Sequence, residues 1–166
     1  MNYTLPFTAI VGMDLVKRSL LYHAIDPRLG GLLLMGHRGC AKSTLARAFR
    51  EILPALETAE TTPFVEVPLG TSEDRLLGSI DASRLLENGE WSAQTGLIQQ
   101  ANGGVLYIDE VNLLPDHLVD SILDSAASGQ HRIERDGLSK TVSARYILIG
   151  SMNPEEGDLR PQLTDR

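Results

Sequence analysis

The stretch that most constrains the fold is a glycine-bearing loop at residues 36–43, which reads GHRGCAKS. The apolar run 32–35 precedes it, and a helical pattern continues from Thr44. A strand, a loop with glycines, a Lys-Ser pair and a helix form the setting that a phosphate-binding P-loop requires. In that setting, backbone N–H groups of the loop and of the first helical turn converge on phosphate oxygens, and the helix dipole adds positive potential. The stretch therefore predicts a strand–helix unit that binds a nucleotide.

Individual positions of this loop have predicted roles. Lys42 is expected to reach the β- and γ-phosphates, and the Ser43 hydroxyl is expected to ligate Mg²⁺. Ala41 stands where the pattern G-x-x-x-x-G-K-[ST] has its second glycine, but it adds only a methyl group and suits a helix start, so we expect it to be tolerated. The alternative is an ordinary glycine-rich turn between a strand and a helix. The predicted nucleotide-binding positions are Gly36, His37, Arg38, Gly39, Cys40, Ala41, Lys42, Ser43 and Thr44.

Composition excludes several classes of protein. The 166 residues suffice for one domain with a sizeable core. A net charge of −7 argues against a nucleic-acid binder that works through general basicity. No apolar run approaches the roughly 20 residues of a membrane helix, and the N-terminus lacks the pattern of a secretory signal. The single Cys40 excludes an internal disulfide framework and a cysteine-based zinc site. We expect a cytoplasmic protein.

Alternating strand and helix patterns predict a parallel α/β sheet with helices on both faces. The polar segment 80–96 is expected to be an insertion with a hairpin at Asn88-Gly89. Two further strands are expected to meet at a turn near Asp136-Gly137. Core strands are expected at 32–35, 64–67, 105–108 and 146–150, hairpin strands at 131–135 and 141–145, and helices at 13–25, 42–53, just after Ser72, 96–101 and 115–128.

Three polar clusters follow the predicted strands: Lys42-Ser43, Asp109-Glu110 and Asn153. Because ligands bind at the carboxyl ends of parallel strands, the three clusters are expected to meet at one edge of the sheet. Asp109 would hold Mg²⁺ through water, opposite the Ser43 hydroxyl, and Glu110 would polarise an attacking water as general base. Asn153 would hydrogen-bond the γ-phosphate or that water.

Each of these assignments has a plainer alternative. The acidic pair could merely cap the next helix, and Asn153 could simply start a turn before Pro154. Phosphoryl transfer also needs positive charge on the γ-phosphate in the transition state. Arg160 and Arg166 are the candidates for an arginine finger, and a solvated surface arginine is the alternative for each.

Longer strings in the chain resemble the ATPase subunit of magnesium chelatase, within the AAA+ superfamily. The most specific are Glu134-Arg135-Asp136-Gly137 and the string from Asn153 to Leu163, which reads NPEEGDLRPQL. The resemblance extends over nearly the whole chain. The other matching strings are AIVG at 9–12, 26–39 from Asp-Pro to GHRG, PLGTSEDR at 68–75 and LYIDEVNLL at 106–114.

This resemblance implies features that the spacing of motifs does not. Ile10, Val11 and Gly12 would contact adenine, Asn153 would be the sensor-1 residue, and Arg166 would be the arginine finger acting on ATP in the adjacent subunit. The subunits would form a ring, usually a hexamer. Members of the family work with a von Willebrand A-type partner and a large porphyrin-binding subunit, and they insert Mg²⁺ into protoporphyrin IX.

The family also has a final core strand and a helical lid after the position of Arg166. We therefore expect residues 1–166 to be an AAA+ core truncated before the lid, with the P-loop strand at an exposed sheet edge and with poor ATP turnover by itself. Two readings compete with the chelatase motor. One is a MoxR-type AAA+ ATPase that remodels a protein complex with a von Willebrand A partner, and the other is a nucleotide-binding regulatory module without turnover.

Overall fold

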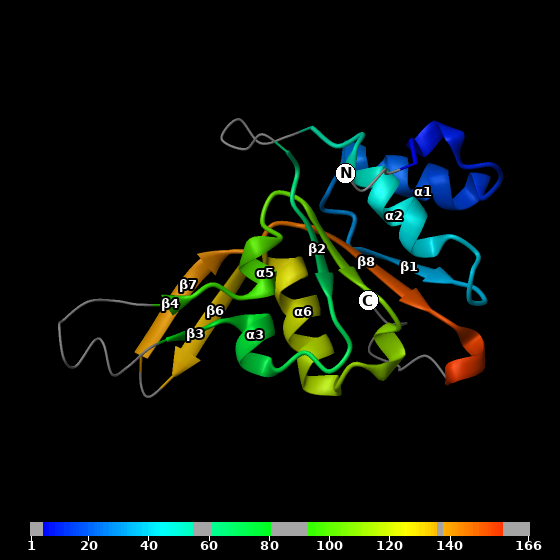
Figure 1. Ribbon diagram of the computed structural model, residues 1–166. Coiled ribbons are helices and arrows are strands. Elements are labelled where there is room, and N and C mark those ends of the chain that lie inside the picture. Colours follow the sequence, from blue (N-terminus) through cyan, green and yellow to red (C-terminus); the bar gives the residue numbers. More distant parts are fainter. Residues whose placement is uncertain (1–4, 55–60, 81–92, 136–137, 158–166) are drawn as a thin grey trace.

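A parallel sheet forms the centre of the molecule in the computed structural model, which describes residues 5–54, 61–80, 93–135 and 138–157 (Figure 1). Its four strands run in the order β1-β8-β5-β2, and each neighbouring pair is parallel. These strands are β1 (Gly31–Met35), β8 (Ile147–Met152), β5 (Val105–Ile108) and β2 (Phe64–Val67). The predicted parallel sheet is confirmed, and the strands at 64–67 and 105–108 match the prediction residue for residue.

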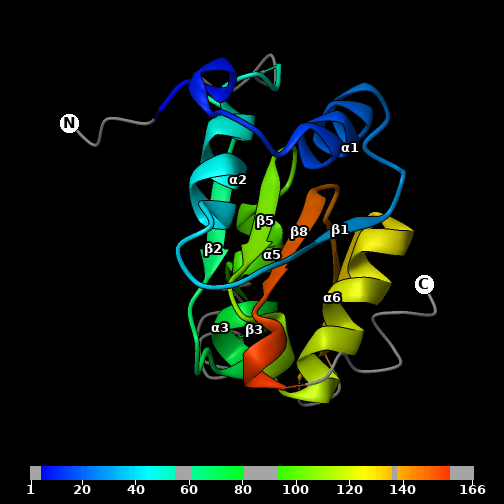
Figure 2. The same cartoon turned by 90° about the vertical axis from the view of Figure 1, so that its right-hand side faces the viewer.

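Helices cover both faces of the sheet (Figures 1 and 2). Alternate residues of β5 serve two cores, because successive side chains of a strand point to opposite faces. Tyr107 lies in one core with Phe49, whereas Leu106 lies in the other with Leu118. The first core involves α1 (Asp14–Ile25) and α2 (Lys42–Arg50), and the second involves α3 (Glu73–Leu77), α5 (Leu97–Gln100) and α6 (Asp116–Ser128).

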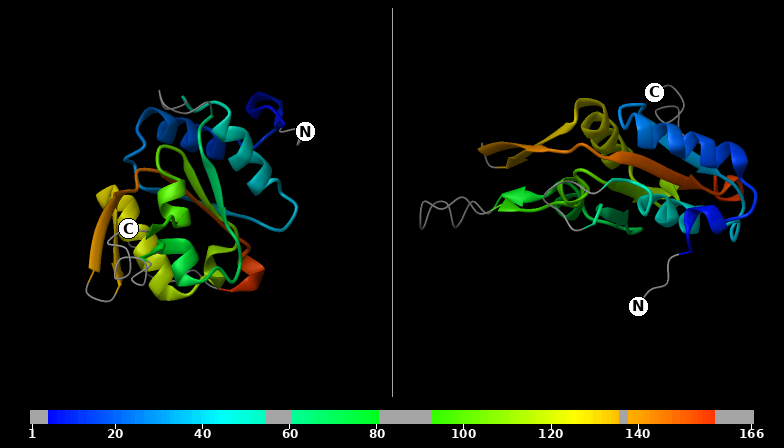
Figure 3. Two further views of the ribbon diagram at one scale, coloured as in Figure 1. Left: turned by 60° about the vertical axis from the view of Figure 1, so that its left-hand side comes forward. Right: turned by 90° about the horizontal axis from the view of Figure 1, so that it is seen from above.

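Two hairpins project from the same end of the sheet (Figure 3). One pairs β3 (Ser79–Ile80) with β4 (Ala93–Gln94), and the other pairs β6 (Gln130–Arg135) with β7 (Leu138–Ser143), both antiparallel. The turns expected at Asn88-Gly89 and Asp136-Gly137 lie outside the described residues. Three short 3₁₀ helices complete the order of elements: η1 (Phe7–Ala9), η2 (Val111–Leu113) and η3 (Pro154–Glu156).

Several predicted boundaries differ from the observed ones; the strand expected at 146–150, for example, runs from Ile147 to Met152. Two of these differences have local reasons. The helix expected to reach residue 53 ends at Arg50, because the next N–H groups bond three residues back and tighten the chain into a turn before Pro54. The strand expected at 141–145 ends at Ser143. There Asn102 accepts hydrogen bonds from the Ser143 hydroxyl and from the backbone of Arg145, which draws the chain out of the hairpin and toward β8.

Strand β1 is an edge strand of the described sheet, with β8 as its single neighbour there. A groove of about 140 Å³ opens between this edge and α6, lined by apolar side chains that include Leu33, Leu123 and Ala126. The edge position agrees with the strand order expected for an AAA+ core. Among the described residues, no helix is long and apolar enough to cross a membrane.

Candidate functional site

The loop before α2 presents backbone N–H groups to a single spot. Gly39 and Ala41 both have left-handed backbone conformations, with φ of 80° and 62°. Left-handed residues at alternate positions of a loop turn successive N–H groups to one side and make a concave site for anions. The N-terminus of α2 extends this site. The helix-start conformation expected for Ala41 was therefore wrong. Ala41 precedes the helix in a conformation that glycine adopts freely and that costs an L-residue about 1–2 kcal/mol.

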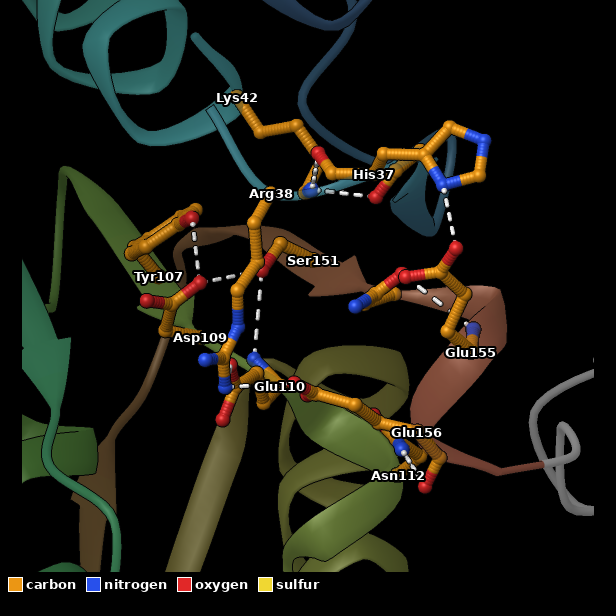
Figure 4. A network of polar contacts seen from close by, with 12 residues as sticks. His37, Arg38, Lys42, Tyr107, Asp109, Glu110, Asn112, Ser151, Glu155 and Glu156 are labelled. Atoms are coloured by element: carbon orange, nitrogen blue, oxygen red, sulfur yellow. Dashed lines mark hydrogen bonds and ion pairs between the residues drawn. The ribbon is translucent and has the colours of Figure 1, made fainter. Parts of the chain in front are cut away.

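Lys42, the first residue of α2, is turned back onto its own loop (Figure 4). Its ammonium group donates hydrogen bonds to the carbonyl oxygens of Gly36 and His37, at 2.6 and 2.9 Å. These carbonyl oxygens accept the hydrogen bonds that the Lys42 ammonium group would otherwise donate to the phosphates of a nucleotide. The loop is therefore closed on itself, and a ligand has to exchange these bonds for its own.

Asp109 lies opposite, directly after β5, and two hydroxyl groups fix its carboxylate (Figure 4). Ser151 of β8 donates to Oδ1 at 2.5 Å, and Tyr107 of β5 donates to the same oxygen at 3.1 Å. Burial raises the pKa of the Tyr107 phenol well above its ordinary value of 10, and the Asp109 charge adds to that shift. Tyr107 therefore stays protonated and remains a donor at any physiological pH.

Glu110 has an unusual backbone conformation for a residue other than glycine. It also forms a salt bridge with Arg38, the one that links the loop to the end of β5 among the described residues. Its φ is 55°, and its N–H donates to the Ser151 hydroxyl at 3.2 Å. Arg38 places one nitrogen 3.1 Å from its carboxylate and 2.5 Å from that of Glu156 (Figure 4). The tip of the loop is thus tied across the site to two acidic residues.

Asn153 follows β8 and is buried. Its side-chain oxygen accepts the N–H of Glu155 at 3.3 Å and so caps η3. The turn-starting role considered from the sequence is therefore present. It does not compete with a role in catalysis, because the same residue also lines the pocket between the loop and the strand ends.

That pocket has a volume of about 290 Å³ and contains members of all three polar clusters. The parallel sheet thus brings Lys42-Ser43, Asp109-Glu110 and Asn153 together, while their individual roles remain predictions. Gly36 and His37 stand outside its lining, and His37 instead pairs with Glu155 at 3.4 Å. The lining consists of Arg38, Gly39, Cys40, Ala41, Lys42, Ser43, Thr44, Tyr107, Asp109, Glu110, Ser151 and Asn153.

The other predicted positions lie away from this pocket. Ile10 is buried in the core beside α1 and α2, Val11 is 95% exposed, and Gly12 turns the chain between them and α1 with a φ of 76°. Both arginine-finger candidates, Arg160 and Arg166, lie outside the described residues.

Sequence reasoning missed two residues of the pocket, Tyr107 and Ser151. Each stands two positions before a predicted residue, Asp109 and Asn153 respectively, at the end of the same strand. Side chains two positions apart on a strand share a face. The two-residue spacing from Asp109 and Asn153 was therefore the signal in the sequence that could have identified Tyr107 and Ser151. Tyr107 was instead interpreted as a member of an apolar core run, and Ser151 was placed just beyond the strand expected at 146–150, although β8 extends to Met152.

The residues present fit a nucleotide with Mg²⁺. Serine and aspartate oxygens, from Ser43 and Asp109, face one pocket beside a concave set of N–H groups. Mg²⁺ typically takes one or two protein oxygens together with water and phosphate oxygens. Within the described ranges, no cluster of three or more His, Cys, Asp or Glu side chains could hold a metal by itself.

Comparison with known proteins adds the family context. Residues 31–166 match the profile of the AAA domain, dynein-related subfamily. The chain is 47% identical to the magnesium-chelatase subunit ChlI of Olisthodiscus luteus and 47% identical to the magnesium-chelatase 38 kDa subunit of Chlorobaculum tepidum. It is also 52% identical to an uncharacterised protein of Mycobacterium tuberculosis. Each alignment covers 97% of this chain.

A solved structure agrees with these relatives. A chain in the complex of the magnesium-chelatase subunits BchI and BchD, based on a cryo-EM reconstruction, superimposes with a TM-score of 0.86 at 46% identity and covers 98% of this chain. The alignments span 54% and 50% of the two chelatase subunits, 26% of the mycobacterial protein and 59% of the solved chain. The chain thus spans about half the length of its chelatase relatives.

Proposed function

The chain belongs to the AAA domain family, in its dynein-related subfamily, and on that premise we propose that it is the ATP-hydrolysing core of a magnesium-chelatase-type motor. The observation that carries the proposal is the single pocket shared by the loop before α2, the acidic pair after β5 and Asn153 after β8. Identities of 45–47% to magnesium-chelatase subunits support the choice of this motor over a MoxR-type remodelling ATPase.

In the proposed reaction, ATP binds with its phosphates at the N-terminus of α2. Lys42 leaves the carbonyls of its own loop and turns to the β- and γ-phosphates. Ser43 and Asp109, the latter through water, would hold Mg²⁺, which would supply positive charge beside the phosphates. Glu110 accepts the proton of the attacking water, and the Asn153 amide donates to that water or to the γ-phosphate.

Val11 and Gly12 are proposed to contact adenine together with the backbone of Ile10, whose side chain is buried. Arg166 is proposed to complete the site of a neighbouring subunit, so that the protein acts as a ring, with a hexamer as the expected form. A von Willebrand A-type subunit and a porphyrin-binding subunit are the proposed partners. The proposed activity of the complex is the insertion of Mg²⁺ into a porphyrin. The described domain is then the ATPase core of a longer cytoplasmic protein, a proposal supported by the share of the relatives that it spans.

The decisive experiment uses the full-length protein, alone and with its candidate partner subunits. ATP hydrolysis is followed by phosphate release, and metal insertion is followed by the change in porphyrin absorbance and fluorescence. The proposal expects hydrolysis that depends on Mg²⁺ and metal insertion that depends on hydrolysis. Hydrolysis without metal insertion into any tetrapyrrole would favour a remodelling ATPase, and nucleotide binding without hydrolysis would favour a regulatory module.

A further inference from the structure

We propose that Ser151 is a positioning residue that fixes both acidic groups of the site at once. Its hydroxyl donates to Asp109 Oδ1 at 2.5 Å and accepts the backbone N–H of Glu110 at 3.2 Å. A serine hydroxyl has one hydrogen to give. With that hydrogen given to Asp109 and an oxygen lone pair given to Glu110, one side chain holds two adjacent residues. This inference rests on the proposed ATPase function, because it assigns a role within the same pocket.

Ser151 is suited to this task by its place in the sheet. It is fully buried in β8, which pairs with β1 on one side and β5 on the other. Its Cα is in register with Leu34 of β1, while the pairing of β8 with β5 has already ended at Ile108 and Gly150. The hydroxyl therefore replaces the missing backbone ladder at the point where β5 turns away from β8.

The two hydrogen bonds have separate consequences. Ser151 and Tyr107 both donate to Oδ1 of Asp109, at 2.5 and 3.1 Å. These two donors orient the carboxylate and leave the lone pairs of Oδ2 for a metal-bound water. Such outer hydrogen bonds generally set the orientation and basicity of the groups that serve a metal, and losing one weakens metal affinity about 10- to 100-fold.

The second hydrogen bond supports a strained backbone. Glu110 has a φ of 55°, a conformation that non-glycine residues keep only where their surroundings over-determine it. The N–H held by Ser151 belongs to this residue, and the direction of the Glu110 side chain follows from its backbone. Ser151 therefore also sets where the proposed general base points.

The test measures coupling between Mg²⁺ and nucleotide in the full-length protein. The affinity for a fluorescent non-hydrolysable ATP analogue is titrated with Mg²⁺ and with EDTA, in the wild type, Ser151→Ala and Ser151→Thr. In Ser151→Ala, the Mg²⁺ concentration needed for half-maximal tightening should rise about tenfold, while affinity in EDTA stays within about twofold. Ser151→Thr keeps the hydroxyl and should restore the wild-type Mg²⁺ response to within about threefold.

A purely structural role would weaken binding with and without Mg²⁺ alike, and that result would overturn the proposal. Unchanged Mg²⁺ coupling in Ser151→Ala would also overturn it. If the alanine variant fails to fold, Ser151→Cys decides on the same criteria, since its thiol fills the space but is a weak hydrogen-bond donor. Because binding and not turnover is measured, a wild-type protein that binds Mg²⁺ and nucleotide but does not hydrolyse ATP would refute the proposed function and still test Ser151.

Discussion

The two walls of the pocket are built differently. The loop wall is open to solvent from His37 to Ala41, and its Lys42 bonds the carbonyls of its own loop. The wall made by β5 and β8 contains the buried Ser151 and Asn153, and two hydroxyl groups hold its Asp109. The first wall must exchange bonds to receive a ligand, whereas the acidic groups of the second already have their partners.

This difference separates two tasks. A loop that satisfies its lysine with its own carbonyls remains stable without a ligand and gives those contacts up when phosphates arrive. A carboxylate fixed by buried donors does not have to reorganise when charge develops in the reaction. Changes in the loop wall should therefore act mainly on nucleotide binding, whereas changes in the strand wall should act mainly on the coupling of Mg²⁺ to the nucleotide and on chemistry.

The largest effect is expected for Glu110→Gln, which keeps the shape of the strand wall and removes its proposed base. Hydrolysis by the full-length protein should fall by about 10²–10⁴-fold, the usual contribution of a general base, while ATP affinity stays within a few-fold of the wild type. Phosphate release and nucleotide titration measure the two quantities. Glu66→Gln, at an exposed salt bridge with Arg47, is the matched control. Unchanged hydrolysis would remove Glu110 from its proposed role.

Lys42→Ala is the corresponding change in the loop wall. It deletes charge-assisted hydrogen bonds to phosphate, which are worth roughly 1.5–3 kcal/mol, so ATP affinity should fall about 10- to 100-fold. Calorimetric titration with an ATP analogue measures this loss. Arg47→Gln removes a cation from the same helix outside the pocket and should leave affinity unchanged. Wild-type affinity in Lys42→Ala would mean that the loop does not receive the phosphates.

Arg38→Ala breaks the salt bridge that joins the two walls. Without Arg38, the carboxylates of Glu110 and Glu156 face the phosphate site with less compensating positive charge, so ATP affinity should fall by up to about fivefold. The loss should shrink at high salt, because the Arg38 side chain is 74% exposed. Titrations at two ionic strengths measure it, with Arg28→Ala, at the exposed pair with Asp26, as the control. Tighter binding in Arg38→Ala would contradict this electrostatic account.

Ala41→Gly should have the smallest effect and the opposite sign. The left-handed backbone costs alanine about 1–2 kcal/mol, a cost that glycine avoids. Glycine loses about 0.4–1 kcal/mol of this advantage, because its unfolded chain has more conformational freedom. The free energy of unfolding should therefore rise by up to about 1 kcal/mol, as measured by urea unfolding. A destabilised glycine variant would show that the methyl group of Ala41 makes a useful contact.

The sequence predicted the frame of the molecule better than the details of the site. Continuous apolar runs such as 105–108 indicate strands buried on both faces, and the parallel order then places the polar clusters at one edge. The role of Tyr107 was not visible, because a hydroxyl inside an apolar run is informative only once its partner is known. The role of Ser151 was missed because the strand was expected to end at Gly150, whereas β8 continues to Met152. The positive φ of Ala41 also depends on the geometry of the whole loop.

The position of β1 at the edge of the described sheet has a practical consequence for anyone who purifies this domain. An edge strand offers unpaired backbone groups to any other extended chain, and here an apolar groove against α6 lies beside it. Two copies that meet through these edges would extend the sheet from one molecule into the next. Concentrated samples of the isolated domain should therefore associate and lose solubility over time. A peptide that pairs with β1 would keep such samples dispersed.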